Sequence, residues 1–351
     1  NVLAQGGLDP TMVIGGKVNA LGSHARLGRG DLLVAEADES DGSFLRLSPT
    51  IVAVTNLDRE HLDHYGSMER INESFLEFIN KIPFYGVAVL CADDDRLAAL
   101  FPRLVKQYHT YGLRDRDGVV PDFKATDISL KQWSAEFRAH FRGKNLGPFR
   151  LAVPGIHNVS NALVAIAIGV ELEIPVDLIR KGLAAFTGVE RRFHLRGEVG
   201  GIMVVDDYGH HPRELKAIID AARGGWPERR LLLVFQPHRY TRTRDLLDDF
   251  ADVLSEVDAL VLTEVYAAGE APIPGADGKA LARAVRARGR IDPVLVKSAR
   301  ELADALQPLA RNGDLILLAG AGDIGAVANE IGARGHPRSG GRHHLGGEQR
   351  R

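Results

Sequence analysis

A chain of 351 residues with 45% hydrophobic and 26% charged residues has the composition of a globular protein long enough for two or three domains. Its 44 basic and 46 acidic side chains give a net charge of −2, which argues against nucleic acid or an acidic membrane as a partner. The single cysteine, Cys91, excludes an internal disulfide, and no apolar run is long enough for a membrane span, so we expect a cytoplasmic protein.

The first half of the chain alternates between strand and helix patterns. Apolar runs at 32–37 and 50–57 predict two strands, and apolar residues at helical spacing predict a helix over 67–82. A strand at 86–94 and a helix at 96–104 continue the alternation, which is typical of a parallel sheet covered by helices. Alternating patterns between 108 and 151 then predict a small antiparallel meander appended to this sheet.

Two helices are predicted next, over 157–174 and 176–186, before a basic, glycine-rich stretch that indicates a domain boundary. Five further strand and helix pairs follow residue 202, as in a doubly wound Rossmann-like domain. We therefore predict an α/β protein with a central domain at 1–189, a Rossmann-like C-terminal domain at 190–332 and a disordered tail of Gly, Arg and His at 333–351.

Acidic and histidine side chains follow two strands of the first domain. The segment LLVAEADESDGSF runs from a strand into carboxylates at 36, 38, 39 and 41, and TNLDREHLDHYG places Asp58, His61, Asp63 and His64 after the next strand. A solvated acidic loop is the simple alternative. Crowded like charges destabilise one another unless water or a cation offsets them, and adjacent parallel strands would deliver both segments to one sheet edge. Oxygen ligands favour Mg²⁺ at such a site, while the histidines leave Zn²⁺ open.

Two further segments suit a phosphate-bearing ligand. PGIHNVSNA places His157, Asn158 and Asn161 at the start of a long helix, where capping by Asn158 or Ser160 and contact with a ligand are compatible. In GVERRFH, Arg191 and Arg192 precede the domain boundary, and an arginine there either clamps a phosphate or is an exposed charge.

The second half carries arginines and histidines after its first two strands. FQPHRYTRTRD contains Arg239 and Arg242 at a spacing that suits a carboxylate. VVDDYGHHPRE contains a doubled histidine that suggests a second metal, although a turn and a helix start at Pro212 explain it comparably well. LAGAGDIG has the GxGxxG spacing of an NAD loop, but no acidic residue follows at the required distance, so tight strand-to-helix packing is the better interpretation.

These motifs, in this order, resemble the Mur ligases over residues 6 to about 331. The matching stretches are GGLDPTMVIGG, EADESDGSFL, VTNLDREHLDHYG, IPFYG, PGIHNVSNA, ERRF, VDDYGHHPRE, FQPHRYTRTRDL, EVYAAGEAPIPGAD and AGAGDIG. The resemblance implies an ATPase-type central domain and an enzyme of peptidoglycan (cell wall) biosynthesis. It would use ATP and Mg²⁺ to join L-alanine to UDP-N-acetylmuramate through an acyl phosphate.

The resemblance also implies roles for individual residues. Glu36 and His61 become magnesium ligands, Arg192 a phosphate contact, and Asp207 a residue at the ATP end of the C-terminal domain. The nucleotide would lie near His157, Asn158 and Asn161. Arg239 and Arg242 become the clamp for the alanine carboxylate, with Tyr208, His210 and His238 lining the same cleft.

The sequence departs from the Mur ligases at its front. The family's N-terminal UDP-binding domain and its GxxGKT phosphate loop have no counterpart in residues 1–351, and no GK[ST] occurs. We therefore expect a truncated chain that does not ligate by itself. A metal-dependent hydrolase, a nicotinamide-dependent oxidoreductase and a non-catalytic fragment are the alternatives, and the sequence does not predict an oligomeric state.

Overall fold

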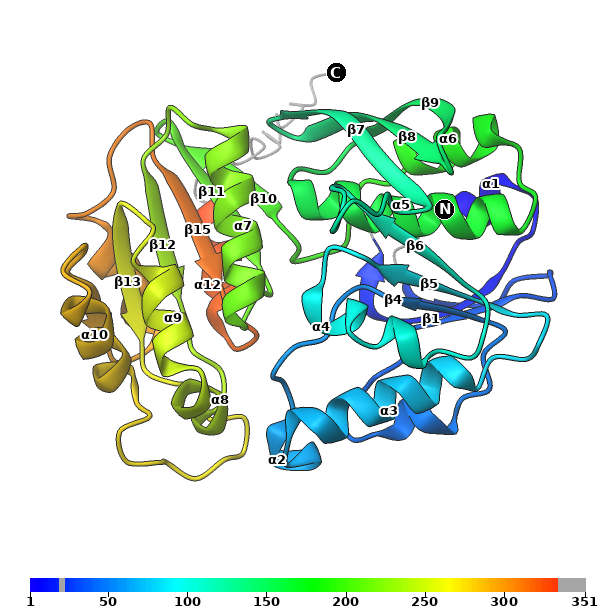
Figure 1. The fold of residues 1–351 in the computed structure, drawn as a ribbon. Helices are drawn as coiled ribbons and strands as arrows, with labels where there is room; N and C mark the ends of the chain where they lie inside the picture. The colour runs from blue at the N-terminus through cyan, green and yellow to red at the C-terminus, as the bar shows by residue number, and fades with distance from the viewer. Residues whose placement is uncertain (19–22, 334–351) are drawn as a thin grey trace, which may run out of the picture. The chain divides into compact units, whose positions relative to one another are not determined.

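Residues 1–18 and 23–333 are described by the computed structural model (Figure 1), and the tail expected beyond them lies outside the described residues. They form two compact units. The first unit comprises residues 1–192 and 213–228, and the second comprises 193–212 and the described chain from 229 onward. The segment 213–228 packs with the first unit although its neighbours on both sides pack with the second. The boundary predicted between residues 189 and 190 stays a prediction.

A six-stranded sheet forms the centre of the first unit. Its order is β4-β5-β6-β7-β8-β9, in which β4 to β7 are parallel and β7 to β9 are antiparallel. The predicted meander is therefore confirmed, and it extends the parallel sheet. The strands are β4 (Ile51–Val54), β5 (Val87–Cys91), β6 (Tyr108–Gly112), β7 (Phe123–Lys131), β8 (Ser134–Phe141) and β9 (Lys144–Leu151).

Helices cover both faces of this sheet, with α3 and α5 on opposite sides (Figure 1). Every residue of β5 is buried, as a central strand between two helical layers requires. Helix α3 (Met68–Asn80) begins at Ser67, whose hydroxyl accepts the Arg70 N–H, and buries Ile71, Phe78 and Ile79. Helices α5 (Ile156–Glu171) and α6 (Val176–Ala184) confirm the other two long helices predicted for this half.

The helix predicted over 96–104 is wrong in extent. A short α4 (Asp95–Ala98), capped by the Asp94 carboxylate, is followed by a separate 3₁₀ turn at Phe101–Arg103. Pro102 explains the break, because proline lacks the N–H that would continue an α-helical ladder and clashes with the preceding turn.

The strand predicted at 32–37 does not join the strand at 50–57. Instead, β3 (Leu33–Ala35) pairs with β1 (Thr11–Val18) in a separate sheet of order β2-β1-β3, with β2 at Ser23–Arg26. A helical turn, α1 (Val2–Gln5), precedes β1 and ends at Gly6. The acidic stretch and the histidine segment therefore start from different sheets, and neighbouring strands of one sheet do not bring them together.

The second unit is built on a six-stranded sheet of order β10-β11-β15-β12-β13-β14. Five strands are parallel and β10 is an antiparallel edge strand, so the predicted Rossmann-like pattern is confirmed. The strands are β10 (His194–Val199), β11 (Ile202–Asp207), β12 (Leu231–Phe235), β13 (Ala259–Thr263), β14 (Val294–Val296) and β15 (Leu315–Ala319).

The helices of the second half follow the strands closely. One face of the sheet packs on residues of α11 and α12, and the other face includes a contact between Phe235 and Phe250 of α9, with ring centroids 5.4 Å apart. The helix predicted after β12 consists of two pieces, because the backbone leaves the helical conformation at Leu246. The helices are α7 (Pro212–Gly225), α8 (Tyr240–Asp245), α9 (Leu247–Leu254), α10 (Gly278–Ala287), α11 (Leu302–Leu306) and α12 (Ile324–Ala333), with a 3₁₀ turn at Ala299–Glu301.

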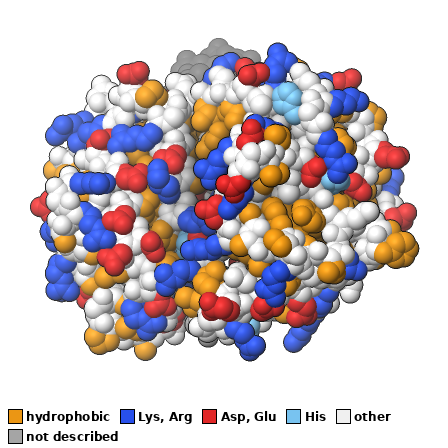
Figure 2. All heavy atoms as spheres, in the orientation of Figure 1, with side chains coloured by type: hydrophobic (Ala, Val, Ile, Leu, Met, Phe, Trp, Pro, Cys, Tyr) orange, Lys and Arg blue, Asp and Glu red, His pale blue; other side chains and the backbone are white. Residues whose placement is uncertain are grey.

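Basic and acidic side chains are interspersed on the face of the molecule shown in Figure 2, as the nearly balanced charge leads one to expect. None of the helices within the described residues is both long and apolar enough to cross a membrane.

Candidate functional site

Two glutamates and a histidine lie together in the first unit, and we call Glu39, Glu60 and His61 the acidic cluster. The Nε2 atom of His61 lies 3.4 Å from a carboxylate oxygen of Glu39 and 4.0 Å from one of Glu60. One ligand atom from each residue lies within 4.8 Å of the others, and all three side chains are half-buried. Two carboxylates and an imidazole at this spacing fit a divalent cation.

The backbone around the acidic cluster is unusual. His61 adopts the left-handed conformation, with φ of 55°, directly before the short helix α2 (Leu62–Tyr65). Non-glycine residues rarely adopt this conformation, and those that do are concentrated at functional sites. The Tyr65 hydroxyl donates to the backbone carbonyl of Glu39 over 2.5 Å and so ties the two loops together. Burial, and then the charges of Glu39 and Asp41, raise the pKa of Tyr65 to about 12.

The structure places His61 in this cluster but Glu36 outside it. The Glu36 carboxylate accepts the N–H of Gly15 over 2.6 Å, so it contacts strand β1 just beyond the residues that pair with β3. The side chain of Asp63 lies outside the described part of the chain. The convergence of the acidic stretch and the histidine segment was predicted, whereas the glutamates that meet His61 are Glu39 and Glu60.

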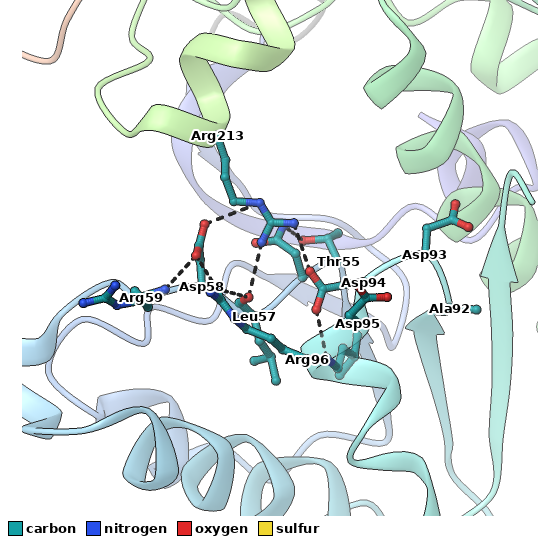
Figure 3. A network of polar contacts seen from close by, with 12 residues as sticks. Thr55, Leu57, Asp58, Arg59, Ala92, Asp93, Asp94, Asp95, Arg96 and Arg213 are labelled. Carbon is teal, nitrogen blue, oxygen red and sulfur yellow. Dashed lines mark hydrogen bonds and ion pairs between the residues drawn. The ribbon is translucent and has the colours of Figure 1, made fainter. Parts of the chain in front are cut away.

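Arg213, in the first turn of α7, braces the loop that carries the acidic cluster (Figure 3). Its guanidinium donates to Asp94 Oδ2 over 3.0 Å and to the Leu57 carbonyl over 3.3 Å, and its Nε lies 3.4 Å from Asp58 Oδ2. Arg96 reaches Asp58 from α4 over 2.5 Å. Burial opposes the charge on Arg213, but its contacts with Asp94 and Asp58 outweigh this and raise its pKa.

At the start of α5, His157 is the side chain with an unsatisfied polar atom. Its Nδ1 is buried and has no hydrogen-bond partner among the described residues. Burial, followed by the charge of Arg192, lowers the pKa of His157 to about 4, so the imidazole is neutral at pH 7. The expected cap by Asn158 is wrong, because its side chain donates to the Pro154 carbonyl over 2.6 Å. Asn161 is exposed on the same helix.

The boundary arginine and the acids after β11 have clear contacts. Arg192 forms an ion pair of 3.0 Å with Glu214. Asp207 is buried, and its carboxylate accepts the N–H groups of Phe193 and Gly209, each over 2.6 Å. In this structure, Asp207 therefore fixes the backbone directly before β10 and directly after β11, and the role that the resemblance implies for it stays a prediction.

The predicted arginine clamp lies in the second unit, and we call Arg239, Arg242 and His238 the arginine cluster. Arg239 precedes α8 with φ of 71° and Arg242 lies within α8, so both follow the carboxyl end of β12. Burial, and then His210, Arg242 and Arg239, lower the pKa of His238 to about 4. The buried Nδ1 of His238 has no hydrogen-bond partner among the described residues.

Two residues near the arginine cluster were not predicted. Glu270 accepts the N–H and the hydroxyl of Thr241 over 3.0 and 2.6 Å and lies 3.9 Å from Arg239. Tyr266 stacks on His238, with centroids 5.5 Å apart and planes 8° apart. Both residues lie in EVYAAGEAPIPG, one of the stretches that resemble the Mur ligases. An aromatic and an acidic residue directly after β13 were the available signal.

Comparisons with known proteins agree with this arrangement. The family models match residues 17–169 as "Mur ligase middle domain" and residues 191–322 as "Mur ligase, glutamate ligase domain". These two matches, together with the two α/β units of the fold, define a ligase of this class. The chain belongs to the Mur ligase family.

Two of the similar proteins are named as UDP-N-acetylmuramate–alanine ligases. The chain is 52% identical over 330 residues to the UDP-N-acetylmuramate–L-alanine ligase of Geobacter sp. strain M21, covering 94% of this chain and 71% of the relative. The crystal structure of UDP-N-acetylmuramate-alanine ligase MurC from Thermotoga maritima matches 95% of this chain and 70% of that one, with a TM-score of 0.77 at 27% identity. MurF ligase from Thermotoga maritima in complex with ADP shares the fold, with a TM-score of 0.72 at 19% identity over 95% of this chain and 76% of that one.

Proposed function

We propose that this protein takes part in the ATP-dependent ligation of L-alanine to UDP-N-acetylmuramate, a step of peptidoglycan synthesis. The observation that carries the proposal is the 52% identity, over 94% of the chain, to a relative named for this ligation. The structural neighbour that was crystallised with ADP supports a nucleotide in the same fold. Because ATP and a nucleotide-linked sugar are cytoplasmic metabolites, the proposed location is the cytoplasm.

The proposed reaction has two steps. A carboxylate oxygen of the muramoyl group attacks the γ-phosphorus of ATP, and ADP leaves, which gives an acyl phosphate. The amine nitrogen of L-alanine then attacks the acyl carbon, inorganic phosphate leaves, and the nitrogen loses a proton to give the amide. Both steps depend on holding charged reactants in a fixed orientation.

The first unit supplies the groups suited to the phosphate step. A divalent cation in the acidic cluster would neutralise charge on the transferred phosphoryl group. Glu39 and Glu60 offer oxygen ligands beside the single imidazole of His61, a set that suits Mg²⁺ better than the nitrogen and sulfur sets typical of Zn²⁺. We propose that neutral His157 contacts the nucleotide through its unsatisfied Nδ1, with Arg192 nearby as a phosphate contact.

The second unit supplies the groups suited to the amino acid. Arg239 and Arg242 are always charged and are spaced to bind one carboxylate, and the negative Glu270 keeps Arg239 in place. Tyr208, His210 and His238 form the adjacent surface through ring contacts of 5.5 Å each. These roles follow from residue chemistry and the family together.

The proposal is tested by the phosphate released from ATP when UDP-N-acetylmuramate and L-alanine are both present. Since the chain spans 71% of its Geobacter relative, the assay compares residues 1–351 alone with the same residues joined to the part of that relative which they do not cover. Alanine-dependent release by the joined protein, reduced about 30-fold or more in Arg239→Ala, is the expected result. Release that does not depend on alanine, or on ATP, would favour the metal-dependent hydrolase instead.

A further inference from the structure

Four aromatic rings form a row that shares His238 with the arginine cluster. We call Tyr208, His210, His238 and Tyr266 the aromatic row. Consecutive ring centroids lie 5.5 Å apart in each of the three pairs. The first two contacts are edge-on, and the last, between His238 and Tyr266, is parallel to within 8°. Tyr208 and Tyr266 at the two ends remain 38% and 40% exposed, so the row presents ring surface to solvent.

Tyr266 is held in place by its backbone. Its N–H donates to the Pro237 carbonyl over 2.8 Å, and its carbonyl accepts the Arg239 N–H over 2.9 Å. These two bonds pair the segment after β13 with the segment that carries the arginine cluster. The bonds from Thr241 to Glu270 close the other end of the Tyr266 loop. Consequently the ring of Tyr266 and the backbone of Arg239 have a fixed relationship.

The GxGxxG stretch explains why the ring can lie there. A Cβ atom on Gly322 would lie 2.8 Å from Cγ and Cδ2 of Tyr266 and 2.3 Å from Oε1 of Gln236. Gln236 is itself fixed, because it donates to Asp323 over 2.7 Å and accepts the Ile324 N–H over 3.2 Å. Only glycine therefore leaves space for the Tyr266 ring, which agrees with the packing role that the sequence indicated for this loop.

The part of the row at His238 has features of a ligand surface. The buried Nδ1 of His238 has no partner among the described residues, which is costly unless a ligand or water satisfies it. The left-handed Arg239 follows directly in the chain, and such a conformation is kept where the surroundings demand it. A ligand whose carboxylate meets Arg239 would therefore have its remaining atoms next to His238 and Tyr266.

We propose that Tyr266, seated by Gly322, is a specificity-determining residue that limits the size of the amino-acid side chain accepted beside the arginine cluster. This inference rests on the proposed function, because it takes the arginine cluster as the carboxylate site for L-alanine. A rigid ring packed against glycine cannot retreat, so a side chain larger than a methyl group meets the ring face. Each additional methylene at such a wall changes affinity by about 10-fold or more.

The test measures amino-acid binding, not turnover. Dissociation constants of glycine, L-alanine and L-valine are determined by NMR titration for residues 1–351 and for Tyr266→Ala, Tyr266→Phe, Gly322→Ala and Arg239→Ala. In Tyr266→Ala we expect the preference for L-alanine over L-valine to fall about 10-fold or more, with alanine affinity changed far less. Tyr266→Phe keeps the ring, so its preference should equal that of the parent protein.

Gly322→Ala is the independent second variant, because its added methyl displaces the ring without removing it. It should change the alanine-to-valine ratio in a protein whose circular dichroism is unaltered. An unchanged ratio in a folded Tyr266→Ala protein would overturn the inference, even if Gly322→Ala does not fold. Absent alanine binding in the parent protein, or alanine binding unchanged in Arg239→Ala, would instead contradict the proposed function.

Discussion

The acidic cluster and the arginine cluster are assembled in different ways. In the first unit, Glu39 and Glu60 place like charges beside His61 on two loops that start from separate sheets. In the second unit, Arg239 has an acidic neighbour, Glu270, and backbone bonds to Tyr266 within one parallel sheet. We therefore expect a cation to offset the charge of the acidic cluster, whereas in the arginine cluster Glu270 already offsets one of the two arginine charges.

Each of the two units also contains a histidine that is neutral at pH 7. His157 and His238 each have a buried Nδ1 without a hydrogen-bond partner among the described residues, and burial is the main reason that the pKa of each falls to about 4. Unsatisfied imidazole nitrogens next to charged groups are expected where a ligand completes the site. We therefore expect a bound ligand to supply the hydrogen-bond partner that the Nδ1 atom of each histidine lacks.

The sharpest way to break this comparison is a metal titration. Electron paramagnetic resonance of Mn²⁺, used as a probe in place of Mg²⁺, is expected to show binding that Glu39→Gln and Glu60→Gln each weaken about 10- to 100-fold, since each variant removes a ligand. A 100-fold loss corresponds to about 2.7 kcal/mol. His61→Gln should weaken binding as well, because both the geometry and the resemblance assign it to the metal.

Glu36→Gln is the matched control for that titration. The geometry predicts little change, because the Glu36 carboxylate accepts the Gly15 N–H and lies outside the acidic cluster. A loss larger in Glu36→Gln than in Glu39→Gln would support the ligand set implied by the resemblance. Mn²⁺ binding that none of these variants alters would remove the metal from this cluster altogether.

Much of the fold could be predicted because its signals are local. The alternation of buried strands such as β5 with amphipathic helices such as α3 is written in hydrophobic spacing, and the meander shows as a change of period. Strand pairing is not local, so nothing in the sequence near Leu33 shows that β3 pairs with β1 and not with β4. The break after α4 does have a local signal, because Pro102 cannot continue an α-helix.

The sequence predicted which two segments form the acidic cluster, but not which of their side chains meet. The acidic stretch and the TNLDREHLDHYG segment do meet, yet which glutamate faces His61 depends on loop geometry that residue spacing does not encode. Tyr266 and Glu270 were missed because their contacts with His238 and Thr241 join two strands that lie side by side only in the folded sheet. Such contacts across the sheet leave no periodic signal in a single sequence.

A smaller effect, on pH dependence, sharpens the role of His157. Its pKa of about 4 in the folded protein lies below the ordinary value of 6.5, so between these values the unfolded chain binds the proton more readily. The contribution of His157 to the free energy of unfolding is therefore fully present above pH 6.5 and is lost as the pH drops towards 4. Urea unfolding should show His157 contributing a loss of about 1 to 2 kcal/mol between pH 7 and pH 5.

His157→Gln isolates this contribution because glutamine does not titrate. The difference in unfolding free energy between the two pH values should be smaller in the variant than in the parent protein. His238→Gln should have the weaker effect, since His238 is only half-buried and solvent screens its charge. An equal pH dependence in the parent protein and His157→Gln would show that the imidazole is not held neutral by burial.

The smallest expected effect asks whether the acidic cluster is braced as the arginine cluster is. A double-mutant cycle of Arg213→Ala and Asp94→Asn should give a coupling of about 1 kcal/mol in unfolding free energy, because Asp94 is buried while the Arg213 side chain is 50% exposed. Lys216 and Asp220 form a surface pair on the same helix, α7, and are the matched control, with an expected coupling of about 0.3 to 0.5 kcal/mol.

The same variants connect the brace to the metal. Arg213 contacts Asp58 and the Leu57 carbonyl, three or four residues before His61, so its loss should loosen the loop and weaken Mn²⁺ binding by a few-fold, about 0.5 to 1 kcal/mol. Lys216→Ala should leave Mn²⁺ binding unchanged. If Arg213→Ala lowers stability but not Mn²⁺ affinity, the Arg213 contacts do not organise the acidic cluster for its cation. The two clusters would then differ, because Glu270 contacts Arg239 directly.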